Sequence, residues 1–200
     1  MNTENVIQKN RKGRLFVVSG PSGVGKTVLA AEIVSFFSPG LVYSVSATSR
    51  NPRGNEKDGK DYFFLAKGDF ETAISENKFA EWALVHGNYY GTPKSFLDSN
   101  LEKSISVLMN IDVQGADKIA ESYPESVKIF ILPPSMDVLE ERLRKRNMDS
   151  EKDLVKRLSN AKEEILHKTN YHHLVINDNF DKAVAELKSI FSSYIFPEKA

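Results

Sequence analysis

The stretch Gly20-Pro21-Ser22-Gly23-Val24-Gly25-Lys26-Thr27 lies between a short apolar run at residues 15–18 and a segment, residues 28–37, whose apolar side chains recur at helical spacing. In such a loop the glycines let backbone N–H groups converge on a phosphate, the lysine reaches the β- and γ-phosphate oxygens, and the threonine hydroxyl can bind Mg²⁺. A helix that starts here also directs its partial positive charge at the anion. The sequence therefore predicts that residues 20–27 bind a nucleoside triphosphate, with Thr27 as the Mg²⁺ ligand. The alternative is a glycine-rich turn with a solvated lysine.

The composition excludes several classes of protein. The chain has 200 residues, 40% of them hydrophobic, and its 27 basic side chains balance 27 acidic ones. This balance does not favour a nucleic-acid polymer or an anionic membrane as a partner. The absence of cysteine excludes disulfides and thiolate zinc sites, and no apolar stretch is long enough for a signal peptide or a membrane span. We expect a cytoplasmic protein with one compact domain and a flexible tail at residues 1–13.

Apolar runs suited to buried strands alternate with segments of helical periodicity. The predicted strands are residues 15–18, 41–45, 105–111, 127–132 and 174–176. The predicted helices are residues 28–37, 69–77, 135–146, 152–167 and 180–191. Ser135, after two prolines, is a candidate N-cap. Such alternation is typical of an α/β fold, and together with the loop it predicts a P-loop NTPase-type parallel sheet flanked by helices.

Two segments interrupt this alternation. Residues 46–92, hereafter the insertion, are rich in glycine, tyrosine, asparagine and charge, and they predict a small inserted mixed-β subdomain. Residues 144–168, hereafter the lid, are densely charged and predict a mobile helical flap. The core would then comprise residues 14–45, 93–143 and 169–200.

Several motifs resemble those of the guanylate kinase family. They are Ser44-Val45-Ser46-Ala47-Thr48-Ser49-Arg50-Asn51-Pro52-Arg53, Gly59-Lys60-Asp61-Tyr62-Phe63-Phe64, Phe79-Ala80-Glu81-Trp82-Ala83, Gly87-Asn88-Tyr89-Tyr90-Gly91-Thr92, Ile111-Asp112-Val113-Gln114-Gly115 and Pro133-Pro134-Ser135. With the phosphate loop and the arginines of the lid, the resemblance covers nearly all of residues 13–191. It implies an enzyme of purine nucleotide metabolism that requires Mg²⁺ and transfers the γ-phosphoryl group of ATP to GMP or dGMP. It also implies that the insertion binds GMP.

The resemblance implies that Glu81 selects the base. Guanine presents N–H donors at N1 and N2, which a fixed carboxylate can accept together, whereas adenine presents the lone pair of N1. The hydroxyls of Ser46 and Thr92 match positions that complete guanine recognition, and polar groups that the wrong base leaves unpaired make such a site selective. Without the surrounding motifs, ordinary turn or strand chemistry would be the favoured explanation of these hydroxyls.

Arg50 and Arg53, together with Tyr62 and Tyr90, match the positions that hold the phosphate of GMP. Guanidinium groups suit phosphate oxygens, and tyrosine hydroxyls add donors without adding charge. Solvated loop arginines and tyrosines packed in a core are the alternatives. Glu56 either bridges the two arginines or is an exposed loop glutamate.

Arg142 and Arg146 are four residues apart on one predicted helix, so both can face the same anion, and Arg157 follows on the next helix. Arginines that close over a transferring phosphoryl group stabilise its charge and exclude water. The resemblance implies that these three, with Lys26 and Arg53, are the catalytic residues. The spacing alone favours a helix surface held by salt bridges to neighbouring glutamates.

Asp112 follows an apolar strand, where it either orients Mg²⁺-bound water or the acceptor nucleotide, or is an ordinary turn residue. Two positions depart from the family's pattern. Asn110 stands where an acidic residue is usual, and Val28 stands where a hydroxyl commonly touches the α-phosphate, a loss of about 1 kcal/mol. Asn177 matches the segment that borders the adenine of ATP, although a plain turn also explains it.

Three hypotheses remain. The first is a guanylate kinase, a monomer or homodimer whose partners are ATP and GMP or dGMP. The second is a protein-binding module that keeps this fold without catalysis, and the intact Lys26 and Thr27 argue against it. The third is a kinase for a phosphorylated sugar or another nucleotide, against which Glu81 argues. The four histidines form only a weak zinc pattern, so we predict no structural metal.

Overall fold

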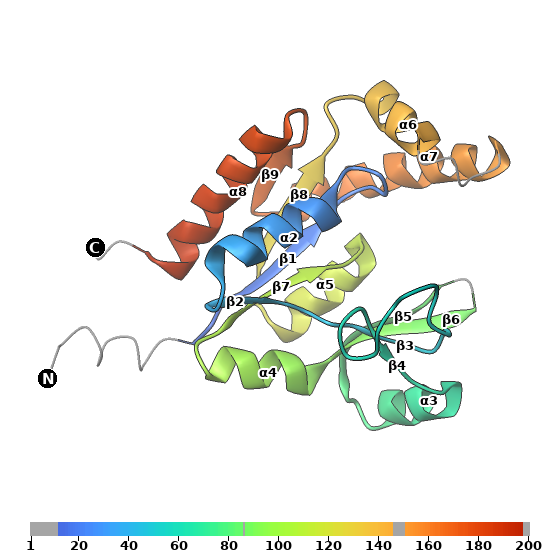
Figure 1. The fold of residues 1–200 in the computed structure, drawn as a ribbon, viewed down its shortest axis with the longest axis vertical. Helices are drawn as coiled ribbons and strands as arrows, with labels where there is room; N and C mark the ends of the chain where they lie inside the picture. The colour runs from blue at the N-terminus through green and yellow to red at the C-terminus, as the bar shows by residue number, and fades with distance from the viewer. Residues whose placement is uncertain (1–11, 86, 146–150, 198–200) are drawn as a thin grey trace, which may run out of the picture.

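The structure is a computed structural model that describes residues 12–85, 87–145 and 151–197. Within these residues the central sheet contains five parallel strands in the order β2-β7-β1-β8-β9 (Figure 1). Their bounds are β1 Leu15–Ser19, β2 Leu41–Tyr43, β7 Ser106–Asn110, β8 Val127–Leu132 and β9 His173–Ile176. The parallel sheet and the predicted strands are therefore confirmed.

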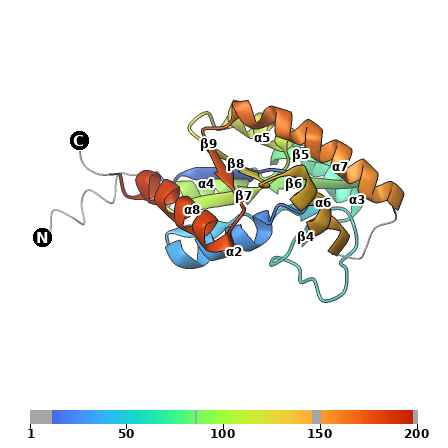
Figure 2. The ribbon, with the colours of Figure 1, turned by 90° about the horizontal axis from the view of Figure 1, so that it is seen from above.

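Helices cover both faces of this sheet (Figure 2). They are α2 Lys26–Phe37 and α8 Phe180–Ile195 on one face, and α4 Lys94–Glu102 and α5 Val113–Ser122 on the other. In β1, Phe16 and Val18 face α2 and α8, whereas Leu15 and Val17 face the opposite cluster. The Phe16 ring stacks on Phe191 of α8 with centroids 4.1 Å apart. Because both faces are buried, the strands are apolar along their whole length.

The insertion forms a second sheet in the order β4-β3-β6-β5. Its strands are β3 Ala47–Thr48, β4 Phe63–Phe64, β5 Phe79–Val85 and β6 Asn88–Pro93, and α3 Lys67–Ser75 packs beside them. The pairs β3–β6 and β5–β6 are antiparallel and β3–β4 is parallel, so the sheet is mixed as predicted. Stacked rings of Phe70, Phe79 and Tyr89 fix α3 to the sheet.

Two charged helices, α6 Met136–Lys145 and α7 Glu151–Leu166, project from the core beyond the phosphate loop, and a short 3₁₀ helix, η1 His167–Asn170, follows α7 (Figure 1). A small cluster that includes Leu139, Leu143, Leu154 and Ala161 packs α6 against α7. Ser135 accepts a hydrogen bond from Val138 N at 3.2 Å, as predicted for an N-cap. No helix in the described part of the chain is long and apolar enough to cross a membrane.

The helices α4 and α5 were not among the predicted helices. Both are short, and α5 contains Gly115 and a polar half, so neither carries a long apolar stripe. Their apolar residues, such as Leu97 and Ile119, are buried against the central sheet. Packing against the central sheet therefore stabilises these two short helices.

Candidate active site

The phosphate loop joins the end of β1 to the start of α2. Gly20, Gly23 and Gly25 have φ angles of 143°, 89° and 102°, which L side chains rarely adopt. The Lys26 ammonium donates hydrogen bonds to the carbonyls of Gly20 and Pro21, the second at 3.1 Å. The lysine therefore lies across the concave side of its own loop, where its charge can face a phosphate.

Close neighbours also restrict these glycines. A Cβ atom at Gly20 would lie 2.3 Å from Ile131 O, one at Gly23 would lie 2.7 Å from Leu143 Cδ2, and one at Gly25 would lie 2.6 Å from Asn177 Nδ2. The loop is thus wedged between β8, α6 and the end of β9. Its shape is set by the fold before any ligand binds.

Asn177 supports the phosphate loop by a hydrogen bond from its side chain to the backbone of the loop. Its side chain is buried, and Nδ2 donates to Val24 O at 2.8 Å, while its carbonyl accepts a hydrogen bond from Arg142 Nη2 at 2.9 Å. The predicted role of Asn177 beside adenine stays a prediction, because the side chain visible here serves the loop.

The charged helices α6 and α7 bring arginines to the phosphate loop. Arg157 Nη2 of α7 donates to Ser22 Oγ at 2.8 Å, and Arg142 approaches from α6 through Asn177. Arg144, between them in sequence, is instead paired with Glu140 and Glu151. The salt-bridged helix surface, the alternative from spacing alone, therefore describes Arg144, whereas Arg142 and Arg157 have contacts in the region of the loop. The other predicted catalytic residue of this helix, at position 146, lies outside the described residues.

A buried carboxylate lies on β5 of the insertion. Glu81 is 8% exposed, and Thr92 Oγ1 of β6 donates to its Oε1 at 2.7 Å. The Ser46 hydroxyl lies 3.5 Å from Thr92 Oγ1, so the three predicted base-reading residues are in contact. Burial raises the pKa of Glu81, the negative charge of Asp112 raises it further, and the Thr92 hydrogen bond and Lys118 oppose the shift.

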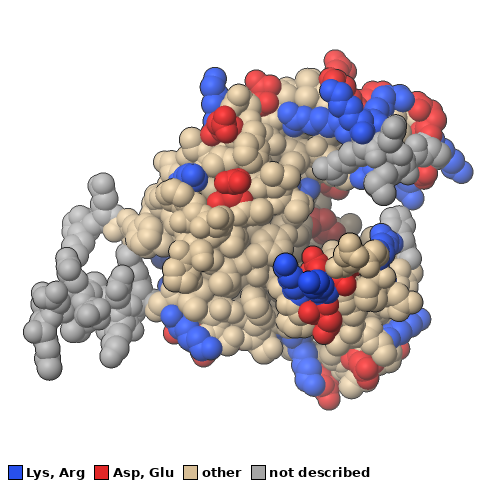
Figure 3. All heavy atoms as spheres, viewed as in Figure 1, with Lys and Arg blue, Asp and Glu red and all other residues tan. Residues whose placement is uncertain are grey.

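A cleft of about 230 Å³ opens beside Glu81. Figure 3 shows the surface hollowed between the lid and the insertion, with Lys and Arg side chains on both sides of the hollow. The polar residues that line the cleft are Ser46, Tyr62, Glu81, Tyr90, Asn110 and Asp112. Five of these six are predicted GMP-binding residues, so the fold gathers residues that are up to 66 positions apart in the sequence (112 − 46).

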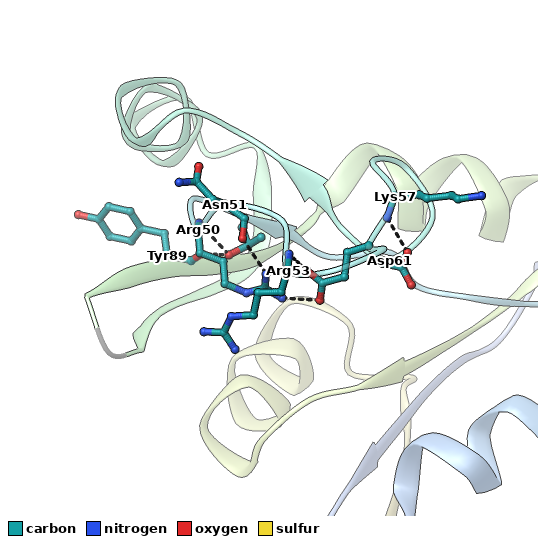
Figure 4. Close-up of polar contacts among 8 residues, drawn as sticks. Arg50, Asn51, Arg53, Lys57, Asp61 and Tyr89 are labelled. Atoms are coloured by element: carbon teal, nitrogen blue, oxygen red, sulfur yellow. Dashed lines mark hydrogen bonds and ion pairs between the residues drawn. The ribbon is translucent and has the colours of Figure 1, made fainter. Parts of the chain in front are cut away.

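Arg50 and Arg53 lie on one loop of the insertion, where both bind Glu56 (Figure 4). Arg50 forms two hydrogen bonds of 2.7 Å to the Glu56 carboxylate, and Arg53 N donates to the same carboxylate at 2.7 Å. These bonds lower the pKa of Glu56 to about 2. Of the two interpretations of Glu56, the bridging one is therefore correct.

The side chain of Arg50 is also oriented by aromatic rings. Its guanidinium carbon lies 5.1 Å from the Tyr62 ring centroid and 5.8 Å from that of Phe64. The Tyr62 and Tyr90 rings meet edge to face at 6.0 Å. Only 9% of the Arg50 side chain is exposed, whereas Arg53 is exposed, so Arg50 is the more rigid of the two arginines.

Asp112 has a structural function that the sequence interpretation did not include. Its Oδ1 accepts a hydrogen bond from Gly115 N at 2.8 Å and so caps α5. Asn110 lies at the end of β7, and its side chain opposes the rise in the pKa of Tyr43 that burial causes. Val28 is exposed on the first turn of α2.

Glu164 of α7 was missed by sequence analysis. Burial raises its pKa, Lys26 opposes that shift and Asp112 reinforces it, so the carboxylate shares the electrostatic environment of the phosphate loop. The signal was its spacing: Arg157, Ala161 and Glu164 are at i, i+4 and i+7, on one face of a helix. Ala161 is buried and Arg157 contacts the loop, which identifies that face as the inner one.

Two larger hollows lie elsewhere on the molecule. One of about 490 Å³ is next to Arg14 and Tyr123, where β1 begins, and one of about 910 Å³ is an apolar groove between α3 and α4. Neither is lined by the phosphate loop or by Glu81. Within the described residues no group of three or more His, Cys, Asp or Glu side chains could hold a metal ion.

Comparison with known proteins gives a consistent result. The family model described as guanylate kinase matches residues 12–194. A guanylate kinase of Caldanaerobacter subterraneus is 46% identical over 180 residues, 90% of this chain and 87% of that protein. One of Mycoplasma genitalium is 45% identical over 94% of this chain and 78% of that protein. The crystal structure of guanylate kinase from Anaplasma phagocytophilum superposes with a TM-score of 0.73 at 33% identity, covering 93% of this chain and 88% of that one.

Proposed function

The chain belongs to the guanylate kinase family, and we propose that it transfers the γ-phosphoryl group of ATP to GMP or dGMP, giving ADP and GDP or dGDP. The observation that carries the proposal is the buried carboxylate of Glu81, which accepts a hydrogen bond from Thr92 and lines a cleft in the insertion, while the phosphate loop with Lys26 lies in the core. Burial raises the pKa of Glu81, so the charged carboxylate lowers the stability of the fold. Buried ionisable groups of this kind are typical of sites that recognise a ligand.

ATP binds with its phosphates in the loop of residues 20–27. The positive φ angles of the glycines turn backbone N–H groups inward, and α2 begins at Lys26 with its partial positive charge toward the same space. Lys26 moves from the loop carbonyls to the β- and γ-phosphate oxygens. Asn177 keeps the loop in this conformation through Val24 O.

GMP binds in the cleft of the insertion. Glu81 accepts the N–H groups of guanine at N1 and N2, and Ser46 and Thr92 complete the recognition. Adenine would present an N1 lone pair to a buried carboxylate, and that repulsion excludes it. Arg50, Arg53, Tyr62 and Tyr90 hold the phosphate, and Glu56 restrains the guanidinium of Arg50 and the backbone of Arg53 before the nucleotide arrives.

The transfer itself needs charge stabilisation more than proton transfer. The phosphate of a nucleoside monophosphate is largely dianionic near neutral pH because its second pKa is about 6, so the nucleophile needs no general base. The charge that spreads over the equatorial oxygens is stabilised by Lys26, Arg53, Arg142 of α6, and Arg146 and Arg157 of the lid. Their approach also excludes water from the phosphoryl group.

Mg²⁺ is the cofactor that the family implies, and the residues present fit it. Thr27 is an exposed hydroxyl next to Lys26 at the start of α2. Mg²⁺ usually binds through few protein oxygens together with phosphates and water, so one hydroxyl suits it better than a cage of carboxylates. The ion would neutralise phosphate charge, and Asp112 and Glu164 are the nearby carboxylates that can orient its waters.

We further propose that the insertion and the lid close over the two nucleotides before transfer. The division into a core, an insertion of residues 46–92 that binds GMP and a lid of residues 144–168 belongs to this proposal. The cytoplasmic location and the monomeric or homodimeric state stay predictions.

The test is ADP release from ATP and Mg²⁺ in the presence of GMP, AMP, CMP or UMP, with a sample that lacks any acceptor. We expect strong stimulation by GMP and at most weak stimulation by the others. No stimulation by any acceptor would contradict the proposal, and equal stimulation by AMP and GMP would contradict the role of Glu81.

A variant of the phosphate loop distinguishes phosphoryl transfer by this protein from the activity of a contaminating kinase. Lys26→Met keeps the length of the side chain and removes its charge, so we expect GMP-dependent ADP release to fall by about 100-fold or more. Lys12→Met, an exposed lysine before β1, is the matched control and should retain activity.

A further inference from the structure

Lys118 of α5 joins the core to the insertion next to the base-reading carboxylate. Its ammonium donates a hydrogen bond of 2.7 Å to the carbonyl of Trp82, and it lies 5.4 Å from the centroid of the Trp82 ring. Trp82 follows Glu81 directly on β5. The lysine therefore holds the backbone of β5 at the point where the strand presents Glu81.

The contact between α5 and β5 is close at Gly115. A Cβ atom at this position would lie 3.3 Å from Glu81 Oε2 and 3.5 Å from Asp112 Oδ1. The glycine therefore lets the Glu81 carboxylate rest against the first turn of α5. Any displacement of β5 from α5 would move this carboxylate relative to the cleft.

The charges that face Glu81 come from two elements. On α5, Asp112 disfavours the ionised carboxylate and Lys118 favours it, and on β6 the Thr92 hydroxyl and its backbone favour the ionised form. Burial disfavours ionisation more than any of these. Lys118 is the cation in this set, so it offsets part of the cost of keeping a negative charge in the cleft.

We propose that Lys118 is a positioning residue for guanine recognition, which holds β5 on α5 through Trp82 O and contributes a positive charge to the surroundings of the Glu81 carboxylate. It touches neither nucleotide and acts through Glu81. This inference rests on the proposed function, because it assumes that Glu81 reads the base of GMP.

Three substitutions separate the hydrogen bond from the charge. Lys118→Met removes both, Lys118→Gln keeps a neutral donor for Trp82 O, and Lys118→Arg keeps both. Lys94→Met is the matched control, because Lys94 also links a core helix to the insertion, through Asn77 Oδ1 at 3.1 Å, but is not among the charges that act on Glu81.

Each variant is compared with the wild type by KM for GMP, KM for ATP and kcat at about pH 6 and about pH 8.5. In Lys118→Met we expect KM for GMP to rise about fivefold at the lower pH and by less at the higher one, with kcat and KM for ATP nearly unchanged. Lys118→Gln should keep the pH-dependent part of the loss, and Lys118→Arg should restore the wild-type profile.

The fluorescence of Trp82 reports the contact between Lys118 and Trp82 without any turnover, because Trp82 is the single tryptophan of the chain. In Lys118→Met the ammonium group next to the Trp82 ring is lost, so we expect the emission of Trp82 to change. In Lys94→Met the emission should stay unchanged. If Lys118→Met and Lys94→Met have the same KM for GMP at both pH values, the inference is wrong.

Equilibrium binding of GMP to the wild type distinguishes this failure from a failure of the proposed function. If the wild type does not bind GMP, the proposed function is wrong. If the wild type binds GMP and Lys118→Met binds it equally well at both pH values, the proposed function stands and Lys118 has no role in it.

Discussion

Replacing Glu81 with glutamine is the most informative perturbation of the site. Thr92 Oγ1 donates to Glu81 Oε1, so the amide oxygen of a glutamine would stay with Thr92 and its NH₂ group would turn toward the base. The donors of guanine at N1 and N2 would then face another donor. A hydrogen bond to a charged group contributes about 1.5 to 3 kcal/mol, so losing this pair costs about 3 kcal/mol, roughly 100-fold in kcat/KM.

The assay is the rate of ADP formation at saturating ATP as the concentration of GMP is varied. We expect kcat/KM for GMP to fall by about 100-fold while KM for ATP is unchanged. Glu71→Gln is the matched control, since Glu71 is an exposed carboxylate of the same insertion that accepts a hydrogen bond from Tyr89. A Glu81→Gln variant with kcat/KM for GMP close to that of the wild type would refute the reasoning.

Stability separates a loss of recognition from a loss of folding. Burial raises the pKa of Glu81, so its ionised form opposes folding, and this cost grows as the pH rises through the raised value. The glutamine variant lacks this cost. We therefore expect Glu81→Gln to unfold at the same temperature as the wild type, or at a higher one, near pH 8.

Three further predictions test other parts of the site. Gly25→Ala should weaken ATP binding by about tenfold or more, measured by calorimetry, because the φ of 102° and a contact of 2.6 Å oppose any Cβ atom there; unchanged affinity would contradict the geometry of the loop. Arg157→Ala should lower kcat by about 100-fold with little change in KM for GMP. Arg144→Ala removes exposed ion pairs, so its kcat should stay within about twofold of the wild type. Equal effects of the two substitutions would contradict the separation of their roles. Glu56→Gln should have a lower free energy of unfolding in urea than the wild type near neutral pH. This difference should decrease as the pH falls from about 4.5 to about 2, because the wild-type carboxyl then also becomes neutral. A pH-independent difference would exclude the Arg50 interaction as its cause.

The core of the fold was predictable because its determinants are local. The phosphate loop is a contiguous motif, and β1, β8 and α8 are marked by apolar patterns within one element. Helix α5 was not predictable in this way, because it is short and its stability comes from Asp112 and from packing on the sheet.

The site was predictable only in part. Glu81, Thr92 and Ser46 meet through strand pairing across the insertion, which no local pattern indicates, and only resemblance to a family grouped them. Spacing could not distinguish Arg142 from Arg144 on the same helix, because the partner of Arg142, the carbonyl of Asn177, comes from another element. Lys118 escaped notice for the same reason, because its partner is the carbonyl of Trp82 on β5.

The central claim is that one protein holds ATP in the loop at Gly20–Thr27 and GMP beside Glu81 and transfers the γ-phosphoryl group from ATP to GMP. The most direct measurement uses ATP labelled in its γ-phosphate, mixed with GMP and Mg²⁺, followed by separation of the nucleotides. The account predicts that the label appears in the β-phosphate of GDP. Label that stays in ATP, or appears only as inorganic phosphate, would contradict it.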